Sequence, residues 1–344
     1  MKYNLTKYSH GSGCGCKLSP GVLSEVLGEN VSGNGFEHLL VGSDTRDDAA
    51  VAAIDDENAI VSTTDFFMPI VDDPHDFGAI AAANAISDIY AMAATPLMAV
   101  AILGWPIDKL PATVAREVID GARQVCHLAG TPLAGGHSID SPEPIFGLAV
   151  TGRVNIKHIR KNKDAHVGDL LYLTKPLGIG IVTTAQKKKL AAPEDLEWAR
   201  QSMIKLNSFG ALLAPLSYVH AITDVTGFGL AGHLLEVCDA SRVSATVYKE
   251  NIPVFGFVEK YIQKDCIPGG TNRNWQTYGH RVSLEDPDFY KVIADPQTSG
   301  GLLITVAPEN KNEFESFADE HKTKVFEIGR LEKSSAKSII SVCP

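Results

Sequence analysis

Short apolar segments of strand character alternate with longer helical segments along this chain, and that alternation limits the folds that it can adopt. Helical segments repeat their apolar residues with a period near 3.6, whereas buried strands are short apolar runs. In the first part of the chain the pattern predicts helices over 76–94 and 111–129, and strands over 59–64, 96–104 and 145–154. Pro111 fits the start of the second helix, where a missing amide donor is tolerated. This order predicts a mixed α/β domain.

A second α/β unit follows a polar, basic stretch over 157–163, which marks the connection between the two units. The pattern there predicts strands over 170–174, 243–249 and 301–306, helices over 179–190 and 195–213, and a Gly-rich turn into a helix over 224–237. Two such units fit neither a barrel of eight equal units nor a helix bundle. We therefore expect a mobile reactive loop over 1–20, an N-terminal domain over 21–156 and a C-terminal α/β domain over 157–344.

The charge of the chain argues against nucleic acid as a partner. Its 31 Lys and Arg residues against 41 Asp and Glu residues give a formal net charge of −10, which repels phosphate backbones unless basic side chains gather locally. The short run Lys187–Lys189 is better explained as a solvated helix face. No uninterrupted apolar run approaches the roughly 20 residues that a membrane span needs. The cysteines show no paired zinc spacing and no leader precedes them, so we expect a cytoplasmic protein.

Thiols and glycines gather near the N-terminus, in the segment HGSGCGCK over 10–17. Its alternating glycines allow close approach of a ligand to the backbone, and an extended conformation would place Cys14 and Cys16 on one side. A thiolate is a strong nucleophile, and a cation such as Lys17 favours that form. The segment is either a reactive loop or a Gly-rich terminus whose cysteines have no role.

Five aspartates lie at the ends of predicted elements: Asp47, Asp48, Asp65, Asp88 and Asp224. Asn84 is four residues before Asp88, so both occupy one face of the predicted helix, among alanines and isoleucines that should be buried. A buried carboxylate needs a partner, and Mg²⁺ prefers carboxylate, water and phosphate oxygens. The alternative for a single residue, Asp224 above all, is a cap or turn position before a helix.

Glycine turns supply main-chain donors that bind phosphate at helix starts. The chain offers four candidate turns, over 133–138, 178–180, 227–229 and 299–301. None matches the P-loop pattern, and no dinucleotide-binding motif lies in a credible βαβ unit. His137 in the first of them is either a phosphate donor or an ordinary turn residue.

Taken together, seven segments resemble the selenophosphate synthetase family, also called selenide, water dikinase, across nearly the whole chain. They are YSHGSGCGCK over 8–17, TRDDAA over 45–50, STTDFFMPIVD over 62–72, NAISDI over 84–89, LAGGHSID over 133–140, TDVTGFGLAGH over 223–233 and DPQTSGGL over 295–302. The resemblance implies the two-domain architecture of the aminoimidazole-ribonucleotide-synthetase-like superfamily. It also implies a homodimer in which motifs from both protomers complete each ATP site.

The resemblance further implies a reaction in which ATP, selenide and water give selenophosphate, AMP and orthophosphate, with selenophosphate serving as the selenium donor for selenocysteine and selenouridine. Cys14 would be the reactive residue and Lys17 the essential cation, with a selenium-delivery protein as a possible partner. Mg²⁺ would be held by Asp48, Asp88 and Asp224. The nucleotide would be contacted by Lys17, Thr45, Arg46, Asp47, Asp65, Asp88, Gly136, His137 and Ser138, with Cys16 and Asn84 in accessory roles.

Two other functions stay open at this point. Another enzyme of the same superfamily, such as a kinase of a small metabolite, would also need magnesium carboxylates and glycine turns, but it would not need the Cys14–Lys17 segment. A non-catalytic selenium or nucleotide carrier would need only the thiols, and the distributed aspartates would then be unnecessary.

Overall fold

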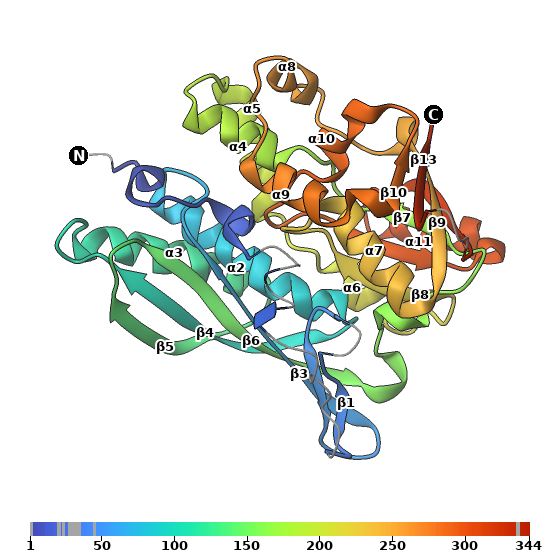
Figure 1. Cartoon of the computed structure of the whole chain (residues 1–344). Helices are drawn as coiled ribbons and strands as arrows, with labels where there is room; N and C mark the ends of the chain where they lie inside the picture. The colour runs from blue at the N-terminus through green and yellow to red at the C-terminus, as the bar shows by residue number, and fades with distance from the viewer. Residues whose placement is uncertain (1–2, 19–21, 23–24, 27–35, 44–45, 335–337) are drawn as a thin grey trace.

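Two β-sheets, one in each half of the chain, form the framework of the protein, and helices lie between and around them (Figure 1). The structure is a computed structural model that describes residues 3–18, 22, 25–26, 36–43, 46–334 and 338–344, with the backbone alone of Cys16. Within these ranges, none of the helices has both the length and the apolar character that a membrane span requires.

The first sheet has six strands, and all neighbours run antiparallel except for the last pair. In spatial order the strands are β1 (Leu39–Val41), β2 (Ala50–Ala53), β3 (Asn58–Phe67), β6 (Ile145–Asn155), β4 (Thr95–Trp105) and β5 (Leu133–Asp140). Helix α2 (Pro74–Ala91) lies against β3, β4 and β6, and helix α3 (Ala112–Leu128) packs on α2. The two helices approach so closely that a Cβ atom on Gly78 would lie 1.8 Å from the carbonyl oxygen of Val118.

Helix α2 is buried along almost its whole length and links the two halves of the molecule. It starts after Asp73, whose side chain accepts a hydrogen bond from the amide of Asp76, with Pro74 in the first turn. On its far side it contacts elements of the second half, including β8 (Val219–Asp224). A helix covered on all sides must be apolar all round, so polar residues within it, such as Asn84, need partners from both halves.

The second sheet has seven strands and carries the core of the C-terminal half. In spatial order they are β10 (Val282–Leu284), β13 (Ile340–Cys343), β9 (Val243–Tyr248), β12 (Phe326–Lys333), β7 (Leu170–Leu173), β11 (Leu302–Val306) and the edge strand β8. Every residue of β11 is buried, because the strand lies between β7 and β8 and is covered on both faces. The edge strand β8 faces α2, and Asp224 is its last residue.

Eight further helices belong to the described part of this half. They are α4 (Ile179–Lys187), α5 (Pro193–Ile204), α6 (Phe209–Leu212), α7 (Gly229–Ser241), α8 (Val258–Ile262), α9 (Gly269–Tyr278), α10 (Tyr290–Ile293) and α11 (Lys311–Glu320). Short 3₁₀ turns fill several connections, among them η1 (Leu5–Tyr8) and η2 (Gly13–Cys16) near the N-terminus and η4 (Asn162–Asp164) between the two halves. The turn η2 contacts β3 of the first half and α9 of the second, so the N-terminal segment, dark blue in Figure 1, reaches both halves.

The mixed α/β class is confirmed, and the predicted strands and the first two predicted helices occur within a few residues of their expected bounds. The single helix expected over 195–213 is wrong. The chain leaves the helix at Lys205 in an extended conformation and starts again as α6. The break has a tertiary cause, because the buried Asn207 side chain donates to Ser87 Oγ at 2.8 Å and to the carbonyl of Gly300 at 2.8 Å.

Three other local expectations are corrected by the structure. Asp224 does not start a helix or cap one: it ends β8, and α7 begins at Gly229. The segment over 133–138 is not a turn but part of strand β5, because it pairs in parallel with β4. The segment around Cys14 is a 3₁₀ turn instead of an extended run.

Candidate active site

Three aspartates from separate elements converge where the two halves meet. Asp48 lies just before β2, Asp88 is on α2, and Asp224 ends β8. One carboxylate oxygen of each lies within 4.8 Å of the other two. These are the three residues that the sequence resemblance named as metal ligands, and the structure brings them together.

Burial and mutual repulsion make it costly for these carboxylates to be charged together. The pKa of Asp48 is raised well above its usual value. Burial is the largest cause, and the negative charges of Asp224 and Asp88 add to it. Burial and the charges of Asp224 and Asp65 do the same for the pKa of Asp88, and burial raises the pKa of Asp224. Hydroxyl donors offset part of this cost: Thr223 Oγ1 donates to Asp48 Oδ1 at 3.0 Å, and Thr63 donates to Asp88.

Two oxygens of the cluster are left without a hydrogen-bond donor among the described residues. They are Asp48 Oδ2 and Asp224 Oδ2, and both are buried. An unpartnered buried carboxylate oxygen is unfavourable unless a cation or donor occupies the space in front of it. The donor set, three carboxylates close together, suits a hard divalent cation such as Mg²⁺.

Cys14 is held next to this cluster and is not at the surface, since it is 1% exposed. Its Sγ donates to Asn84 Oδ1 at 3.3 Å, and its amide donates to Thr298 Oγ1 at 3.1 Å. Gly13, the residue before it, has φ +50° and a Cβ there would lie 2.4 Å from Thr298 Oγ1. Only glycine fits this position without displacing its neighbours.

A hydrogen-bonded chain connects Cys14 to Lys17. Asn84 accepts from Cys14 through Oδ1 and donates through Nδ2 to Asp65 Oδ2 at 2.7 Å, and the same Asp65 oxygen accepts from Lys17 Nζ at 2.8 Å. Burial of the ammonium lowers the pKa of Lys17, but the negative charges of Asp65, Cys14 and Asp88 outweigh it, so the pKa is raised well above its usual value. Lys17 is therefore positively charged at any physiological pH. Its side chain is 35% exposed, so part of it is also in contact with solvent.

The C-terminal half supplies contacts that sequence reasoning did not assign. Thr298 accepts from the Cys14 amide, and the Ser299 amide donates to Asn84 Oδ1 at 2.7 Å. Behind them, Asp295 is fully buried, which raises its pKa to about 8, and it accepts from the Gly180 amide at 3.0 Å and from Gln297 Nε2 at 2.9 Å. The segment DPQTSGGL was part of the resemblance, and its small polar residues were the signal that could have marked them.

The structure places the other residues expected to contact the nucleotide on several elements. Gly136, His137 and Ser138 are on β5, the exposed edge strand, which β6 and β4 separate from β3. Asp47 Oδ1 accepts from the Asn162 amide at 2.7 Å, so it joins the first half to η4. Arg46 is exposed. Thr45 and the side chain of Cys16 lie outside the described residues.

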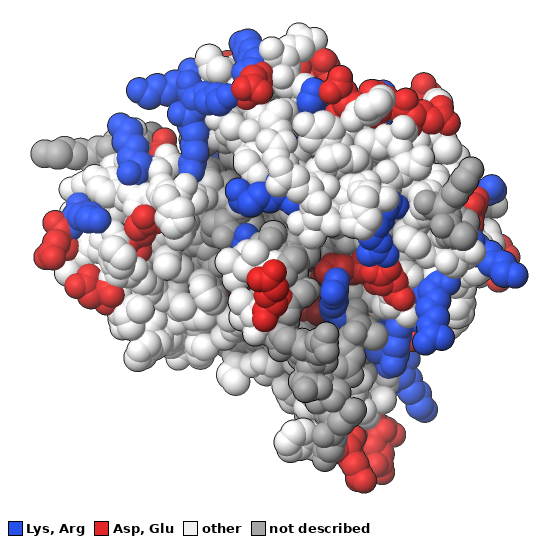
Figure 2. Space-filling view, viewed as in Figure 1, with Lys and Arg blue, Asp and Glu red and all other residues white. Residues whose placement is uncertain are grey.

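A cavity of about 540 Å³ opens beside Lys17 and Asp65. Its walls are mainly apolar and include Phe66, Phe67 and Phe228. A mostly apolar cavity with a few charged groups at one end is typical of small-molecule sites. Figure 2 shows basic and acidic side chains interspersed over the visible face, which gives no support to a nucleic-acid surface there.

Comparisons with known proteins agree with this geometry. The family model "AIR synthase related protein, N-terminal domain" matches residues 46–154, and the corresponding C-terminal domain model matches residues 166–341. The chain is 52% identical to the selenide, water dikinase of Shewanella sp. (strain MR-7), covering 98% of this chain and 96% of the relative. It is 55% identical to the protein of that name from Photorhabdus laumondii, over 98% of both chains.

Solved structures share the fold at much lower identity. The thiamine-monophosphate kinase from Stenotrophomonas maltophilia superposes with a TM-score of 0.67 at 19% identity, covering 89% of this chain and 91% of that one. The hydrogenase maturation protein HypE in complex with ATP superposes with a TM-score of 0.64 at 16% identity, covering 85% and 83%. At these identities the likeness concerns the fold alone.

Proposed function

The chain belongs to the selenide, water dikinase family, and from this premise we propose how its residues carry out the family's reaction. The protein catalyses the ATP-dependent synthesis of selenophosphate from selenide and water, with release of AMP and orthophosphate, and so supplies the selenium donor for selenocysteine and selenouridine. One observation carries the assignment of roles: the half-buried Asp48 and Asp88 and the buried Asp224 converge next to a thiol that Asn84 ties to Asp65 and Lys17.

We assign the metal site to the three aspartates. Two buried oxygens that have no donor among the described residues, Asp48 Oδ2 and Asp224 Oδ2, support this role, as do the raised pKa values of the cluster. When bound, Mg²⁺ would neutralise the charge of the triphosphate and hold it in place. The protein's own contribution is to keep the carboxylates close together before the nucleotide arrives.

Lys17 and Asp65 are proposed to contact the nucleotide at the mouth of the cavity of about 540 Å³. The fixed positive charge of Lys17 favours the binding of anionic phosphate and selenide in a region that is otherwise rich in carboxylates. Thr45, Arg46, Asp47 and Asp88 keep their proposed contacts with ATP. Phosphoryl transfer depends mainly on such positioning and charge neutralisation.

Cys14 is proposed as the reactive residue. Its thiol donates to Asn84 Oδ1 at 3.3 Å, and the Lys17 ammonium, which interacts electrostatically with the sulfur, would stabilise the thiolate once that proton is lost. A thiolate in this position can hold the soft selenium atom close to the phosphates. The role of Cys16 stays an accessory one in this proposal.

We propose that a homodimer completes the site. The face of the first sheet opposite α2 carries large exposed apolar side chains on three strands: Phe66, Met98, Val100 and Ile139 are 46%, 48%, 39% and 61% exposed. Contiguous exposed apolar residues mark an interaction surface, and a second copy there would bring Gly136–Ser138 towards a neighbouring nucleotide. Met98→Lys should then lower the solution mass to that of a monomer, whereas Trp198→Lys on α5 should not. An unchanged dimer in Met98→Lys would contradict this surface.

A direct assay separates this function from its rivals. Incubation with ATP, Mg²⁺ and selenide should give AMP and a phosphorus species bonded to selenium, observed by ³¹P NMR. ADP with a phosphorylated metabolite would instead identify a small-molecule kinase, and the absence of nucleotide turnover would identify a carrier.

The role of Cys14 is tested by Cys14→Ser with Cys343→Ser as the matched control, since Cys343 lies on β13, away from the site. We expect selenide-dependent AMP formation to fall by roughly 10² or more in Cys14→Ser, with Mg²⁺-dependent ATP binding retained. Normal turnover in that variant would remove Cys14 from the mechanism.

Three broader expectations also stay proposals. They are the division of the chain into 1–20, 21–156 and 157–344, a cytoplasmic location, and a protein that delivers selenium. The thiols of Cys126, Cys238 and Cys266, free and buried within the fold, support a reducing compartment.

A further inference from the structure

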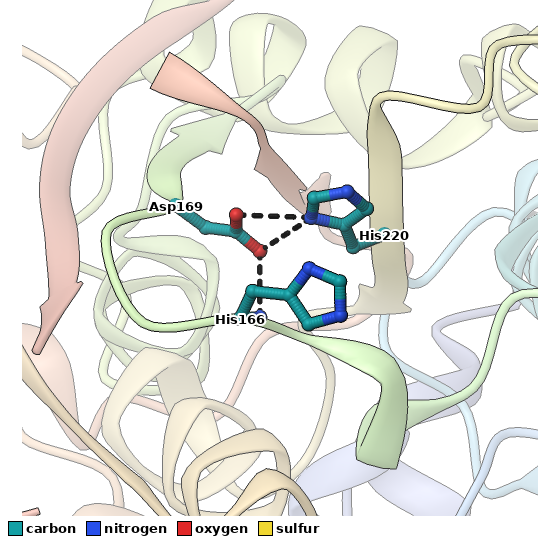
Figure 3. Close-up of side chains that lie close together, drawn as sticks. All are labelled: His166, Asp169 and His220. Carbon is teal, nitrogen blue, oxygen red and sulfur yellow. Dashed lines mark hydrogen bonds and ion pairs between the residues drawn. The ribbon is translucent and has the colours of Figure 1, made fainter. Parts of the chain in front are cut away.

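A second cluster of metal-binding side chains lies outside the active site, at the start of the C-terminal half. His166 and Asp169 belong to the loop between η4 and β7, and His220 is on β8. Ligand atoms of the three side chains lie within 4.8 Å of one another. Figure 3 shows the Asp169 carboxylate directed at the His220 ring, with the His166 ring beside both.

The loop holds these groups in place through its own hydrogen bonds. The His166 amide donates to Asp169 Oδ2 at 2.8 Å, and the Asp169 amide donates back to the His166 carbonyl at 3.2 Å. Gly168 between them has φ +98°, a conformation that side-chain-bearing residues rarely adopt. The loop is thus closed in a fixed shape before any ligand is present.

The carboxylate and the second histidine are already in contact. Both oxygens of Asp169 lie 2.9 Å from His220 Nδ1, and the rings of His166 and His220 lie 4.1 Å apart between centroids. Asp169 is 1% exposed, whereas His166 is exposed to solvent. One side of the cluster is therefore anchored in the fold, and the other opens to the outside.

We propose that His166, Asp169 and His220 form a binding site for a transition-metal ion of the Zn²⁺ class. Two imidazoles and one carboxylate are a donor set that suits Zn²⁺ and its neighbours, whereas Mg²⁺ and Ca²⁺ favour oxygen ligands. Ligands about 2.1 Å from a tetrahedral ion lie about 3.4 Å from one another. The anchored pair is close to that spacing, and the exposed His166 ring needs only a small rotation to reach it.

The site has three protein ligands, which leaves a fourth position for water or an exogenous group. It also connects β7 with β8, the strand that ends at Asp224. His220 precedes Asp224 by four residues on β8, about 13 Å along the strand at the usual rise. Binding of the ion stabilises this strand where it supports the aspartate cluster, and the proposal does not depend on the function assigned to that cluster.

A simpler role for these residues is a hydrogen-bonded link between the loop and β8, made by Asp169 and His220 alone. That role needs no third side chain and gives no metal affinity. The test is therefore a titration of the full chain with Zn²⁺, followed by calorimetry, and with Co²⁺, followed by visible absorption, in the presence of saturating Mg²⁺. The variant His166→Ala removes only an exposed ring and keeps the link intact.

We expect one equivalent of Zn²⁺ whose affinity falls at least tenfold in His166→Ala and in His220→Gln. It should be unchanged in His127→Ala, which removes an exposed histidine from α3. Zn²⁺ should also raise the unfolding temperature of the wild-type chain but not that of His166→Ala. His166→Ala and His220→Gln keep Cys14 and the three aspartates of the active site. If His166→Ala still binds one equivalent of Zn²⁺ with wild-type affinity, the ion is held by those active-site residues and the proposal is overturned. Absence of Zn²⁺ binding to the wild-type chain overturns it as well.

Discussion

Replacing Asp224 by Asn tests whether the aspartate cluster is built for a cation at the expense of the metal-free fold. Two unit charges 4.8 Å apart repel by about 3.5 kcal/mol at an effective dielectric constant of 20. Partial protonation relieves some of this repulsion. We therefore expect Asp224→Asn without Mg²⁺ at pH 8 to be more stable than the wild-type chain by roughly 1–3 kcal/mol.

The sign of the pH dependence follows from the raised pKa values of Asp48, Asp88 and Asp224. The folded chain binds more protons than the unfolded chain between the ordinary aspartate pKa and the raised values. The contribution of these groups to stability is therefore full at low pH and is lost as pH rises through the folded pKa values. Without metal, the wild-type chain should lose stability towards pH 8 more steeply than the variant, and Mg²⁺ should restore it only in the wild type.

The assay is urea unfolding at pH 6 and pH 8, with EDTA or with Mg²⁺, for the wild type, Asp224→Asn and the control Asp265→Asn. The Asp265 side chain is 94% exposed, so its replacement should leave all four midpoints within error of the wild type. A variant that is less stable than the wild type in EDTA at pH 8 would refute the repulsion argument. A Mg²⁺ effect that persists unchanged in Asp224→Asn would refute the metal site.

Two further predictions concern the segment that carries the thiol. Gly13→Ala should lower selenide-dependent turnover at least tenfold with ATP binding retained, because the added Cβ would lie 2.4 Å from Thr298 Oγ1. The control is Gly256→Ala, where nothing lies within 4 Å of an added Cβ. Equal turnover in the two variants would show that the tight turn is dispensable. Asn84→Ala breaks the link to Cys14, so steady-state kinetics should show a kcat lower by roughly 10² with little change in KM for ATP. A change confined to KM would place Asn84 in nucleotide binding alone.

Local pattern predicted α2 well and failed for the region that follows α4. Most residues of α2 are apolar, and they lie on every side of the helix, so the helix is favoured whichever neighbours cover it. The break between α5 and α6 is not a property of the local sequence, because Asn207 is fixed by Ser87 and Gly300 from distant parts of the chain. Strand β5 was missed for a similar reason: its glycines favour a turn, but pairing with β4 decides otherwise.

The same distinction holds within the candidate site. Cys14, Lys17, Asp48, Asp88 and Asp224 could be named from their motifs. The motifs did not predict that Asn84 connects the thiol to Asp65, or that Thr298 and Ser299 fix the thiol and Asn84 from the other half of the molecule. Such contacts join residues far apart in the chain, and no spacing along the sequence records them.

The amino-acid sequence by itself determined the α/β class, the order of most elements and the chemistry available, because hydrophobic periodicity and residue type are local properties. Only the tertiary structure decided that Asp48, Asp88 and Asp224 come together, that Cys14 is buried against Asn84, and that β5 lies at an exposed edge. These facts depend on which faces of the two sheets and of α2 pack together. Packing is set by the whole chain, since each buried polar group must find its partner in three dimensions.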